Sequence, residues 1–338
     1  MEKIDMKKIA QEANVSMTLV SQVLNNRNIR VAEATRRRIL DVASRYQYVP
    51  NRLAAALKLK RTNTIAILVP FTSVGFFSEL IYHIESYALD RGYNTLVLNT
   101  FGDKKKEENA LQFYRSQLAD GFLVAAQNVE TNRIILSQMK SDSIPLVFID
   151  RFVDGIEAPT VSSDHVETAY ELCRKLIDKG KKDIVFIRRV DDPENSTLRG
   201  RVAGYARAME SAGLAPDVLD FHFEGDEGSD LLERLASRPA PEAVFLHSGF
   251  YMPHLLKTCE RLGYGIGAID FGTVDGFLIP FDFSRAGELF EMMRGNITVA
   301  VQDTRGIARR AVDALIETME AGSSVGPGSF IPVEWKEL

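Results

Sequence analysis

Residues 5–25 read DMKKIAQEANVSMTLVSQVLN, and residues 48–58 read YVPNRLAAALK. The first stretch repeats apolar side chains at the spacing of an amphipathic helix, at Met6, Ile9, Ala10 and Ala13. Asp5 precedes this run as a candidate cap, Asn14 tolerates a left-handed turn after it, and Ser16 can cap a second helix. The sequence therefore predicts two short helices joined by a tight turn.

The second helix is predicted to have an inner and an outer face. Its inner face carries Val20, Val23 and Leu24, and its outer face carries Met17, Thr18, Ser21 and Gln22. A third helix over residues 33–45 is predicted to bury Ile39, Leu40 and Ala43. Three helices in this order predict a helix-turn-helix whose second helix enters the major groove of DNA. Taken alone, the pattern also fits a small helical bundle with no DNA-binding role.

The outer face suits contacts with DNA. Gln22 can make a bidentate contact to adenine, and Thr18 or Met17 can contact a thymine methyl group. Basic side chains such as Lys7, Arg27 and Arg36 are predicted to touch phosphates, which fixes position rather than sequence preference.

A short hinge helix is predicted after the three helices. Pro50 stops a preceding helix, and Asn51 can cap a new one over residues 52–57. A helix below about 12 residues is marginal on its own in water, so we expect this segment to fold only when two copies pack together on DNA. Leu57 would then be free to wedge into the minor groove and kink the duplex. A plain linker is the alternative, which the run Ala54-Ala-Ala56 also allows.

Residues 5–338 resemble the lactose repressor/galactose repressor family of bacterial transcription regulators. The residues that carry the resemblance are Lys8-Ile-Ala, Ala13-x-Val-Ser16, Val20-Ser21-x-Val23, Asn25, Thr35-Arg36, Tyr48-x-Pro50-Asn51 and Ala54-x-x-Leu57. The resemblance implies that Leu57 is the intercalating leucine and that positions 17, 18 and 22 read bases. The predicted DNA-binding set is Lys7, Ser16, Met17, Thr18, Ser21, Gln22, Asn25, Arg27, Arg36, Asn51, Ala54, Leu57 and Lys58. The chain departs from the family at Asn14, usually Gly, and at Ala32, which loses a helix cap.

Charge is distributed unevenly along the 338 residues, whose formal net charge is −5. Residues 1–64 hold 13 Lys and Arg against 5 Asp and Glu, whereas the remainder holds 28 against 41. A basic head on an acidic body is typical of local DNA binding. Cys173 and Cys259 are too few for a disulfide framework and predict buried thiols of a cytosolic protein. Neither a signal peptide nor an apolar run long enough to span a membrane is evident.

After residue 60, apolar strand-like runs alternate with amphipathic helices. Strands are predicted at 65–69, 95–98, 121–125, 146–149, 184–187, 243–246 and 267–271. Helices are predicted at 77–91, 107–117, 133–140, 166–179, 198–212, 231–237, 251–262 and 305–321. This alternation indicates parallel sheets covered by helices, and the length indicates two such units.

The family resemblance implies a two-lobed α/β sensor similar to periplasmic sugar-binding proteins. Its marks in the body are Val147-Phe-Ile-Asp-Arg151, Val161-Ser-Ser-Asp164, Arg201-x-x-Gly204-Tyr205 and Val299-x-Val-Gln302. The expected domains are a helix-turn-helix head at 1–48, a hinge helix and linker at 49–60, a first lobe at 61–162 plus 303–325, and a second lobe at 163–302 plus 326–338. The final segment is expected to add a strand to the second lobe.

Ligands of open α/β sheets bind beyond the carboxyl ends of the strands. Polar or aromatic residues at such positions form the predicted effector site: Phe76, Phe77, Asp150, Arg151, Arg201, Ser248 and Asp270. Arg201 resembles the arginine that anchors ligands in the family. Phe77 also suits the core, Asp164 suits a helix cap, and Asp150 and Arg151 can pair with each other.

The expected effector is a sugar or sugar derivative, although the chain departs from sugar-binding relatives. His247-Ser248-Gly249 and Asp270-Phe271-Gly272 stand where the family usually has Asn-Asp and Gly-Phe-Asp or Gly-Tyr-Asp. The segment 273–296 is longer than the family norm and rich in Phe, which favours a lid, a partner surface or an extra helix at 285–294.

These observations predict a cytoplasmic, nucleoid-associated repressor that acts as a homodimer on a near-palindromic operator. Whether the effector releases DNA or promotes its binding stays open. We expect no cofactor, no metal, no membrane association and no enzymatic activity, since no phosphate loop, nucleophile elbow or zinc motif is evident. The alternatives are a solute-binding protein of periplasmic type and an enzyme acting on a small sugar in the cleft.

Overall fold

The computed structural model describes residues 5–24, 29–48, 61–73, 75–127, 130–189, 195–222, 229–275, 295–321 and 328–338. The chain divides into two compact units, Met1–Thr62 and Asn63–Leu338. The described residues of the first unit form three helices, α1 (Met6–Glu12), α2 (Met17–Leu24) and α3 (Glu33–Arg45). The predicted hinge helix, with Asn51, Ala54, Leu57 and Lys58, lies outside the described residues, as do Asn25 and Arg27.

The three-helix unit confirms the predicted caps and turn. Asp5 Oδ1 accepts a hydrogen bond from the Lys8 amide at 2.9 Å, and Ser16 Oγ accepts one from the Leu19 amide at 3.2 Å. Asn14 adopts the left-handed conformation with φ of 50°. The core contains Ile9, Ala10, Ala13, Val20, Val23, Ile39, Val42 and Ala43. The prediction for Leu40 was wrong. It is 45% exposed, because the helical repeat places Val42, not Leu40, on the face that contains Ile39 and Ala43.

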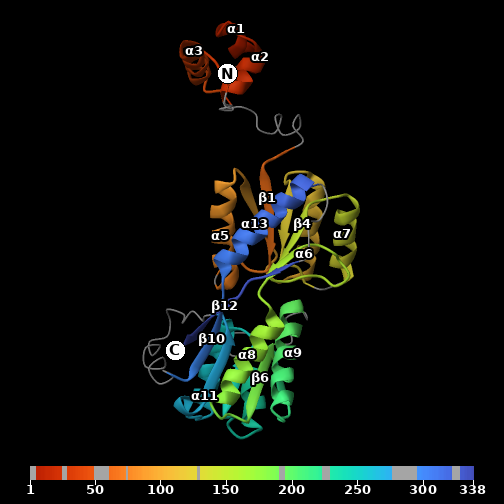
Figure 1. Cartoon of the computed structure of the whole chain (residues 1–338), viewed down its shortest axis with the longest axis vertical. Helices are drawn as coiled ribbons and strands as arrows, with labels where there is room; N and C mark the ends of the chain where they lie inside the picture. Colours follow the sequence, from red (N-terminus) through yellow and green to blue (C-terminus); the bar gives the residue numbers. More distant parts are fainter. Residues whose placement is uncertain are drawn as a thin grey trace. The chain divides into compact units, whose positions relative to one another are not determined.

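The first lobe is built on a six-stranded parallel sheet, with strand order β11-β5-β4-β3-β1-β2. The strands are β1 (Thr64–Val69), β2 (Asn94–Asn99), β3 (Gly121–Val124), β4 (Leu146–Ile149), β5 (Thr160–Ser162) and β11 (Ser329–Phe330). One face packs on α5 (Phe76–Asp90) and α13 (Thr304–Ala321), and the other packs on α6 (Lys104–Leu111), η1 (Gln112–Ser116) and α7 (Glu130–Ser141). Figure 1 shows α5 and α13 beside β1.

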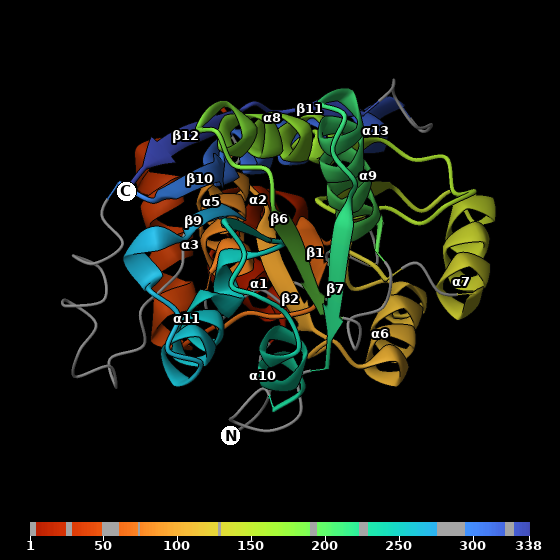
Figure 2. The same cartoon turned by 90° about the horizontal axis from the view of Figure 1, so that it is seen from below.

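The second lobe contains a six-stranded sheet of order β12-β10-β9-β8-β6-β7, in which only β12 is antiparallel to its neighbour. Its strands are β6 (Ile184–Arg189), β7 (Asp217–Phe221), β8 (Ala243–Leu246), β9 (Asp270–Val274), β10 (Ile297–Gln302) and β12 (Val333–Glu337). Helices α8 (His165–Asp178) and α9 (Ser196–Ser211) cover one face, and α10 (Ser229–Ala236) and α11 (Met252–Arg261), with short turns at Gly249–Tyr251 and Ile266–Ala268, cover the other (Figure 2).

Most predicted strands agree with the structure, with three kinds of difference. Strands β5, β7 and β10 were not predicted. Strand β5 has only three residues and β7 mixes charged with apolar residues, whereas β10 is an uncharged, mostly apolar run that the prediction overlooked. Strand β9 begins three residues later than the predicted strand at 267–271. At the chain's end, Ser329 and Phe330 pair with β5 in the first lobe, so the last passage to the second lobe follows at residues 331–332 rather than near residue 326.

Helices α8 and α9 approach each other closely because small residues lie between them. A Cβ atom at Gly204 would lie 2.1 Å from the Val166 carbonyl oxygen and 2.9 Å from the Tyr170 amide nitrogen. At Gly200 it would lie 3.1 Å from His165 Cβ. Glycine at these positions brings the start of α9 against the start of α8, where the polar residues of the cavity described below lie.

Gly204→Ala should therefore destabilise the sensor, because backbone cannot retreat from the new methyl group as a flexible side chain can. We expect a loss of about 2 kcal/mol or more in the free energy of unfolding, measured by urea denaturation. Gly265→Ala is the matched control, since its Cβ would meet only Ala268 Cβ at 3.8 Å. Equal stability of the two variants would contradict the close helix contact.

Candidate functional site

A cavity of about 410 Å³ lies between the two lobes. The first lobe contributes residues that follow β1 and β4. The second contributes the carboxyl ends of β6, β8, β9 and β10 together with the first turns of α9. In each sheet, successive strands are first added on one side of the starting strand and then on the other. This change of side occurs between β1 and β3 in the first lobe and between β6 and β8 in the second. Such switch points are where open α/β sheets bind ligands.

Six of the seven predicted effector residues line this cavity. They are Phe76, Phe77, Asp150, Arg151, Arg201 and Ser248. Asp270 does not, because it begins strand β9 instead of ending it, and its carboxylate pairs with Lys181 Nζ at 2.9 Å. The residue at the carboxyl end of the strand is Asp275, which lines the cavity. The sequence DFGTVD has an Asp at each end, and the prediction placed the wrong one at the carboxyl end.

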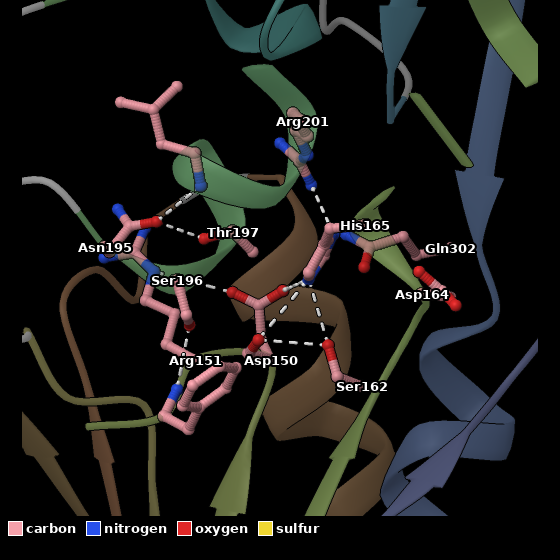
Figure 3. A network of polar contacts seen from close by, with 12 residues as sticks. Asp150, Arg151, Ser162, Asp164, His165, Asn195, Ser196, Thr197, Arg201 and Gln302 are labelled. Carbon is pink, nitrogen blue, oxygen red and sulfur yellow. Dashed lines mark hydrogen bonds and ion pairs between the residues drawn. The ribbon is translucent and has the colours of Figure 1, made fainter. Parts of the chain in front are cut away.

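Asp150 and His165 form the centre of a buried polar network (Figure 3). His165 Nε2 lies 3.4 Å from Asp150 Oδ1 and 3.0 Å from Ser162 Oγ, and Ser162 Oγ donates to the Asp150 carbonyl oxygen at 3.0 Å. Burial raises the pKa of the Asp150 carboxyl, but the contact with His165 and the positive charges of Arg151 and Arg201 outweigh burial and hold the pKa below its usual value. Asp150 is therefore a carboxylate within this network.

Arg201 extends the network into the second lobe. Its Nη1 donates to the His247 carbonyl oxygen at 2.7 Å, and its Nη2 lies 3.5 Å from His165 Nδ1. Since a guanidinium can only donate, His165 Nδ1 must be the acceptor in that contact. Burial lowers the pKa of Arg201, and the charges of Asp275 and Asp150 oppose that shift. Arg201 Nε is buried and has no hydrogen-bond partner among the described residues, which is costly for a buried donor.

Gln302 fixes Asp275 on the other side of Arg201. The Gln302 amide nitrogens of backbone and side chain donate to Asp275 Oδ1 and Oδ2 at 3.2 and 2.9 Å. Burial raises the pKa of the Asp275 carboxyl, against the opposing effects of Arg201 and Gln302. Within the described parts of the chain, Gln302 Oε1 has no donor. Two of the residues that line the cavity thus keep a buried polar atom without a partner among the described residues.

Aromatic rings line the cavity on both lobes. The rings of Phe76 and Phe77 meet edge to face at 5.1 Å, and the Arg151 guanidinium lies 5.3 Å from the centre of the Phe77 ring. Phe77 lines the cavity and is also part of the first-lobe core, as the two alternatives from the sequence allowed. In the second lobe, Tyr251 stacks with His247 at 4.9 Å and accepts a hydrogen bond from Arg189 Nη1 at 3.2 Å. Aromatic faces beside directed polar groups are typical of sites for small polar ligands.

Several lining residues were not predicted from the sequence. They include Phe71, Arg189, Asn195, Thr197, His247, Phe250, Tyr251, Asp275 and Gln302. Asp275 directly follows Val274 at the end of β9, and Arg189 ends β6 one residue after Arg188, signals that could have identified them. Asp164 caps α8, as expected, because its Oδ1 accepts hydrogen bonds from the Val166 and Glu167 amides. The expected pairing of Asp150 with Arg151 is also present, with Arg151 Nε 3.5 Å from Asp150 Oδ2.

On the three-helix unit, the predicted base-reading residues lie on the surface. Met17 is 52% exposed, Thr18 is exposed, and Ser21 and Gln22 are half-buried on the same helix. Lys7 is exposed and Arg36 is half-buried. The Ser16 hydroxyl caps α2. Among the described residues, no group of three or more His, Cys, Asp or Glu side chains could hold a metal ion, and none of the described helices is long and apolar enough to span a membrane.

Comparison with known proteins identifies the family that has this architecture. Residues 62–248 match the model described as periplasmic binding proteins and sugar binding domain of LacI family, and residues 5–51 match that of bacterial regulatory proteins, lacI family. The chain belongs to the lacI family. This lacI-family protein is thus a DNA-binding transcriptional regulator, with the helix-turn-helix head and the periplasmic-binding-protein-like sensor that the sequence predicted.

Relatives match this lacI-family chain along most of its length. The HTH-type transcriptional regulator DegA of Bacillus subtilis is 32% identical over 82% of this chain and 79% of its own. The HTH-type transcriptional repressor PurR of Photobacterium profundum is 28% identical over 93% of this chain and 91% of its own. The structure of the Lac repressor dimer bound to operator and an anti-inducer has a TM-score of 0.80 and 17% identity, covering 99% and 98% of the two chains.

Asp150→Asn should destabilise the sensor at neutral pH, because it removes the carboxylate next to Arg151 and one of the two carboxylates that compensate the buried Arg201. The expected loss is on the order of 3 kcal/mol. Folding lowers the pKa of the Asp150 carboxyl, so the ionised carboxylate stabilises the folded protein at pH values above its unfolded pKa of about 4. That contribution is lost as the pH falls through the lower pKa of the folded state. The difference between the variant and the unsubstituted protein should stay constant from pH 8 to 5 and shrink below pH 4, measured by urea unfolding. Asp178→Asn, at an exposed position, is the control. A difference in unfolding free energy for Asp150→Asn that does not change with pH would contradict the conclusion that Asp150 is a carboxylate with a lowered pKa.

Proposed function

We propose that this regulator represses transcription by binding a near-palindromic operator as a homodimer, and that a small polar effector in the inter-lobe cavity controls it. The observation that carries this proposal is the buried Arg201, which lines the 410 Å³ cavity together with the acidic residues Asp150 and Asp275. The relatives are regulators and repressors, which supports control of DNA binding rather than catalysis as the role of the cavity.

The proposed DNA contacts follow from the surface of α2. Gln22, Thr18 and Met17 would read bases, while Lys7 and Arg36 would contact phosphates. Leu57 would wedge into the minor groove at the operator's centre. The proposed functional divisions are the head at 1–48, the hinge at 49–60 and the two sensor lobes after it. In a bacterial cell these contacts imply a cytoplasmic protein associated with the nucleoid.

The proposed effector is a sugar or a sugar derivative. Asp275 can accept from hydroxyl groups, Arg201 can donate to a hydroxyl or an anionic oxygen, and the rings of Phe76 and Tyr251 can cover an apolar sugar face. We infer that the ligand is bound and not converted. Incubation with fructose 1-phosphate, glucose 6-phosphate, sucrose and ribose, followed by product analysis, tests that inference; turnover of any of them would favour an enzyme.

The repressor proposal is tested by capturing genomic fragments with the purified full-length chain at moderate salt and sequencing them. A sharp palindrome is expected. Diffuse binding that disappears as salt rises would indicate contact with phosphates alone and would overturn the proposal of a specific operator, unless one of the four compounds restored selectivity.

Gln22→Ala should relax base preference at one symmetric pair of operator positions. The expected cost is about 1–3 kcal/mol for the preferred operator and little for operators changed at that pair, measured by fluorescence anisotropy. Lys7→Ala is the control, because loss of a phosphate contact should weaken all sequences alike and reduce the salt dependence. Equal losses on every operator for Gln22→Ala would remove Gln22 from base reading.

Arg201→Gln should abolish the response to the effector while operator affinity is retained, because the head carries the DNA contacts. The readout is the shift in thermal unfolding caused by whichever of the four compounds stabilises the unsubstituted protein. Arg207→Ala, an exposed position on the same helix, should respond normally. A normal response by Arg201→Gln would exclude Arg201 from the effector site.

A further inference from the structure

A bidentate ion pair joins the two lobes beside the cavity. Asp154 lies between β4 and β5 of the first lobe, and Arg199 lies in the first turns of α9 in the second. Arg199 Nη1 is 2.6 Å from Asp154 Oδ2, and Arg199 Nη2 is 2.9 Å from Asp154 Oδ1. We propose that this pair is a latch that holds the lobes in the arrangement enclosing the effector cavity. The latch is a property of the sensor in addition to the ligand site itself.

The carboxylate of the latch is fixed to the first lobe. Arg133 of α7 donates through Nε to the Asp154 carbonyl oxygen at 3.1 Å, and the neighbouring Val153 is buried in the first-lobe core. Gly155, with φ of 79°, reverses the chain directly after Asp154, and the Ile156 amide donates to the Val153 carbonyl oxygen at 3.3 Å. Asp154 is thus at the tip of a turn whose base is packed, so its position follows that of the first lobe.

The guanidinium of the latch belongs to the helical turn that also presents Arg201. The Arg199 amide donates to the Asn195 carbonyl oxygen at 3.1 Å, which places Arg199 within regular helix. Gly200, the next residue, packs on His165, and Arg201 follows with its contacts to His165 and His247. Movement of the second lobe away from the first would therefore break the ion pair and displace Arg201 from the first-lobe residues at the same time.

A neutral contact lies beside the latch. The Phe152 amide of the first lobe donates to Ser196 Oγ of α9 at 3.0 Å, and Ser196 is buried (Figure 3). The ion pair is more exposed, with 39% of the Arg199 and 42% of the Asp154 side chain accessible. Salt screens partly exposed pairs, so ionic strength should weaken the latch while the neutral contact persists. For a pair of this exposure we expect a shift of roughly two- to fivefold in the ratio of open to closed lobes.

The test measures the separation of the lobes directly and uses no ligand. Cysteines introduced for spin labels at Ser137 on α7 and Glu210 on α9, both exposed, report the distance by double electron–electron resonance. Cys173 and Cys259 are buried, and burial raises the pKa of each thiol to about 12, so they should not take the label. Labelled chains are diluted with unlabelled full-length protein so that a dimer carries at most one labelled chain.

Arg199→Asp should increase the population at longer distance two- to fivefold, because it sets two carboxylates against each other. Asp near a helix N-terminus is favourable, so the substitution should not unfold α9. The double variant Asp154→Arg with Arg199→Asp should return the distribution toward that of the unsubstituted protein. Raising KCl from 0.05 to 1 M should lengthen distances in the unsubstituted protein and shorten them in Arg199→Asp, because salt screens the attraction in the first and the repulsion in the second.

Arg207→Asp is the matched control. Arg207 lies on the same helix and its Nη2 is 2.6 Å from Glu167 Oε2, but both residues belong to the second lobe and are similarly exposed. Its distance distribution should not change. The latch is overturned if Arg199→Asp leaves the distribution unchanged, if Arg207→Asp alters it equally, or if the charge-reversed pair fails to restore it. Because no effector is needed, an unsuccessful ligand screen would leave this result intact.

Discussion

The structure of the sensor depends on a buried positive charge. Arg201 is held by a carbonyl oxygen and an imidazole nitrogen, both neutral, while Asp275 and Asp150 compensate its charge from either side. Removing a guanidinium from water is costly unless such compensation exists. The acidic residues at the ends of β4 and β9 therefore stabilise the fold as well as shape the cavity. Arg201 Nε keeps no partner among the described residues, which adds to the cost of burying this side chain.

Close helix packing makes this arrangement possible. Gly200 and Gly204 let α9 approach α8 until His165 lies between Asp150 and Arg201. A larger residue at either position would force the helices apart and lengthen contacts that are already at 3.4–3.5 Å. The network thus depends on residues that carry no polar group. The two glycines therefore allow the helix contact, and the helix contact in turn positions the charged groups around His165.

The sequence was sufficient to predict most strands, the helix caps of the head and six residues of the cavity. Asp150 and Arg151 follow the apolar run of β4 directly, and Ser248 lies two residues after β8; parallel sheets bring such positions to one edge. The other three lie in the first turns of α5 and α9, the helices that follow β1 and β6. His165 was not predicted, because its importance comes from contacts with two lobes and is not evident from spacing along the chain. For the same reason, Gln302 was noted only as one of the residues that carry the family resemblance. Asp275 was missed because two aspartates bracket one strand, and Leu40 was wrongly placed on the buried face of α3, which Val42 completes together with Ile39 and Ala43.

The links between the lobes restrict how they can move. Only Ile331 and Pro332 separate β11 in one sheet from β12 in the other, and this segment reaches about 11 Å at full extension. The other two links leave β5 and β10, which are the direct neighbours of β11 and β12. All three links therefore lie along one edge of each sheet. Strands β2 and β7, at the opposite edges, are joined to no link between the lobes. Sliding or wholesale separation is excluded by chain length, and the remaining freedom is rotation about an axis along the linked edge. Any displacement grows with distance from that axis, so β2 and β7 would sweep the widest arc.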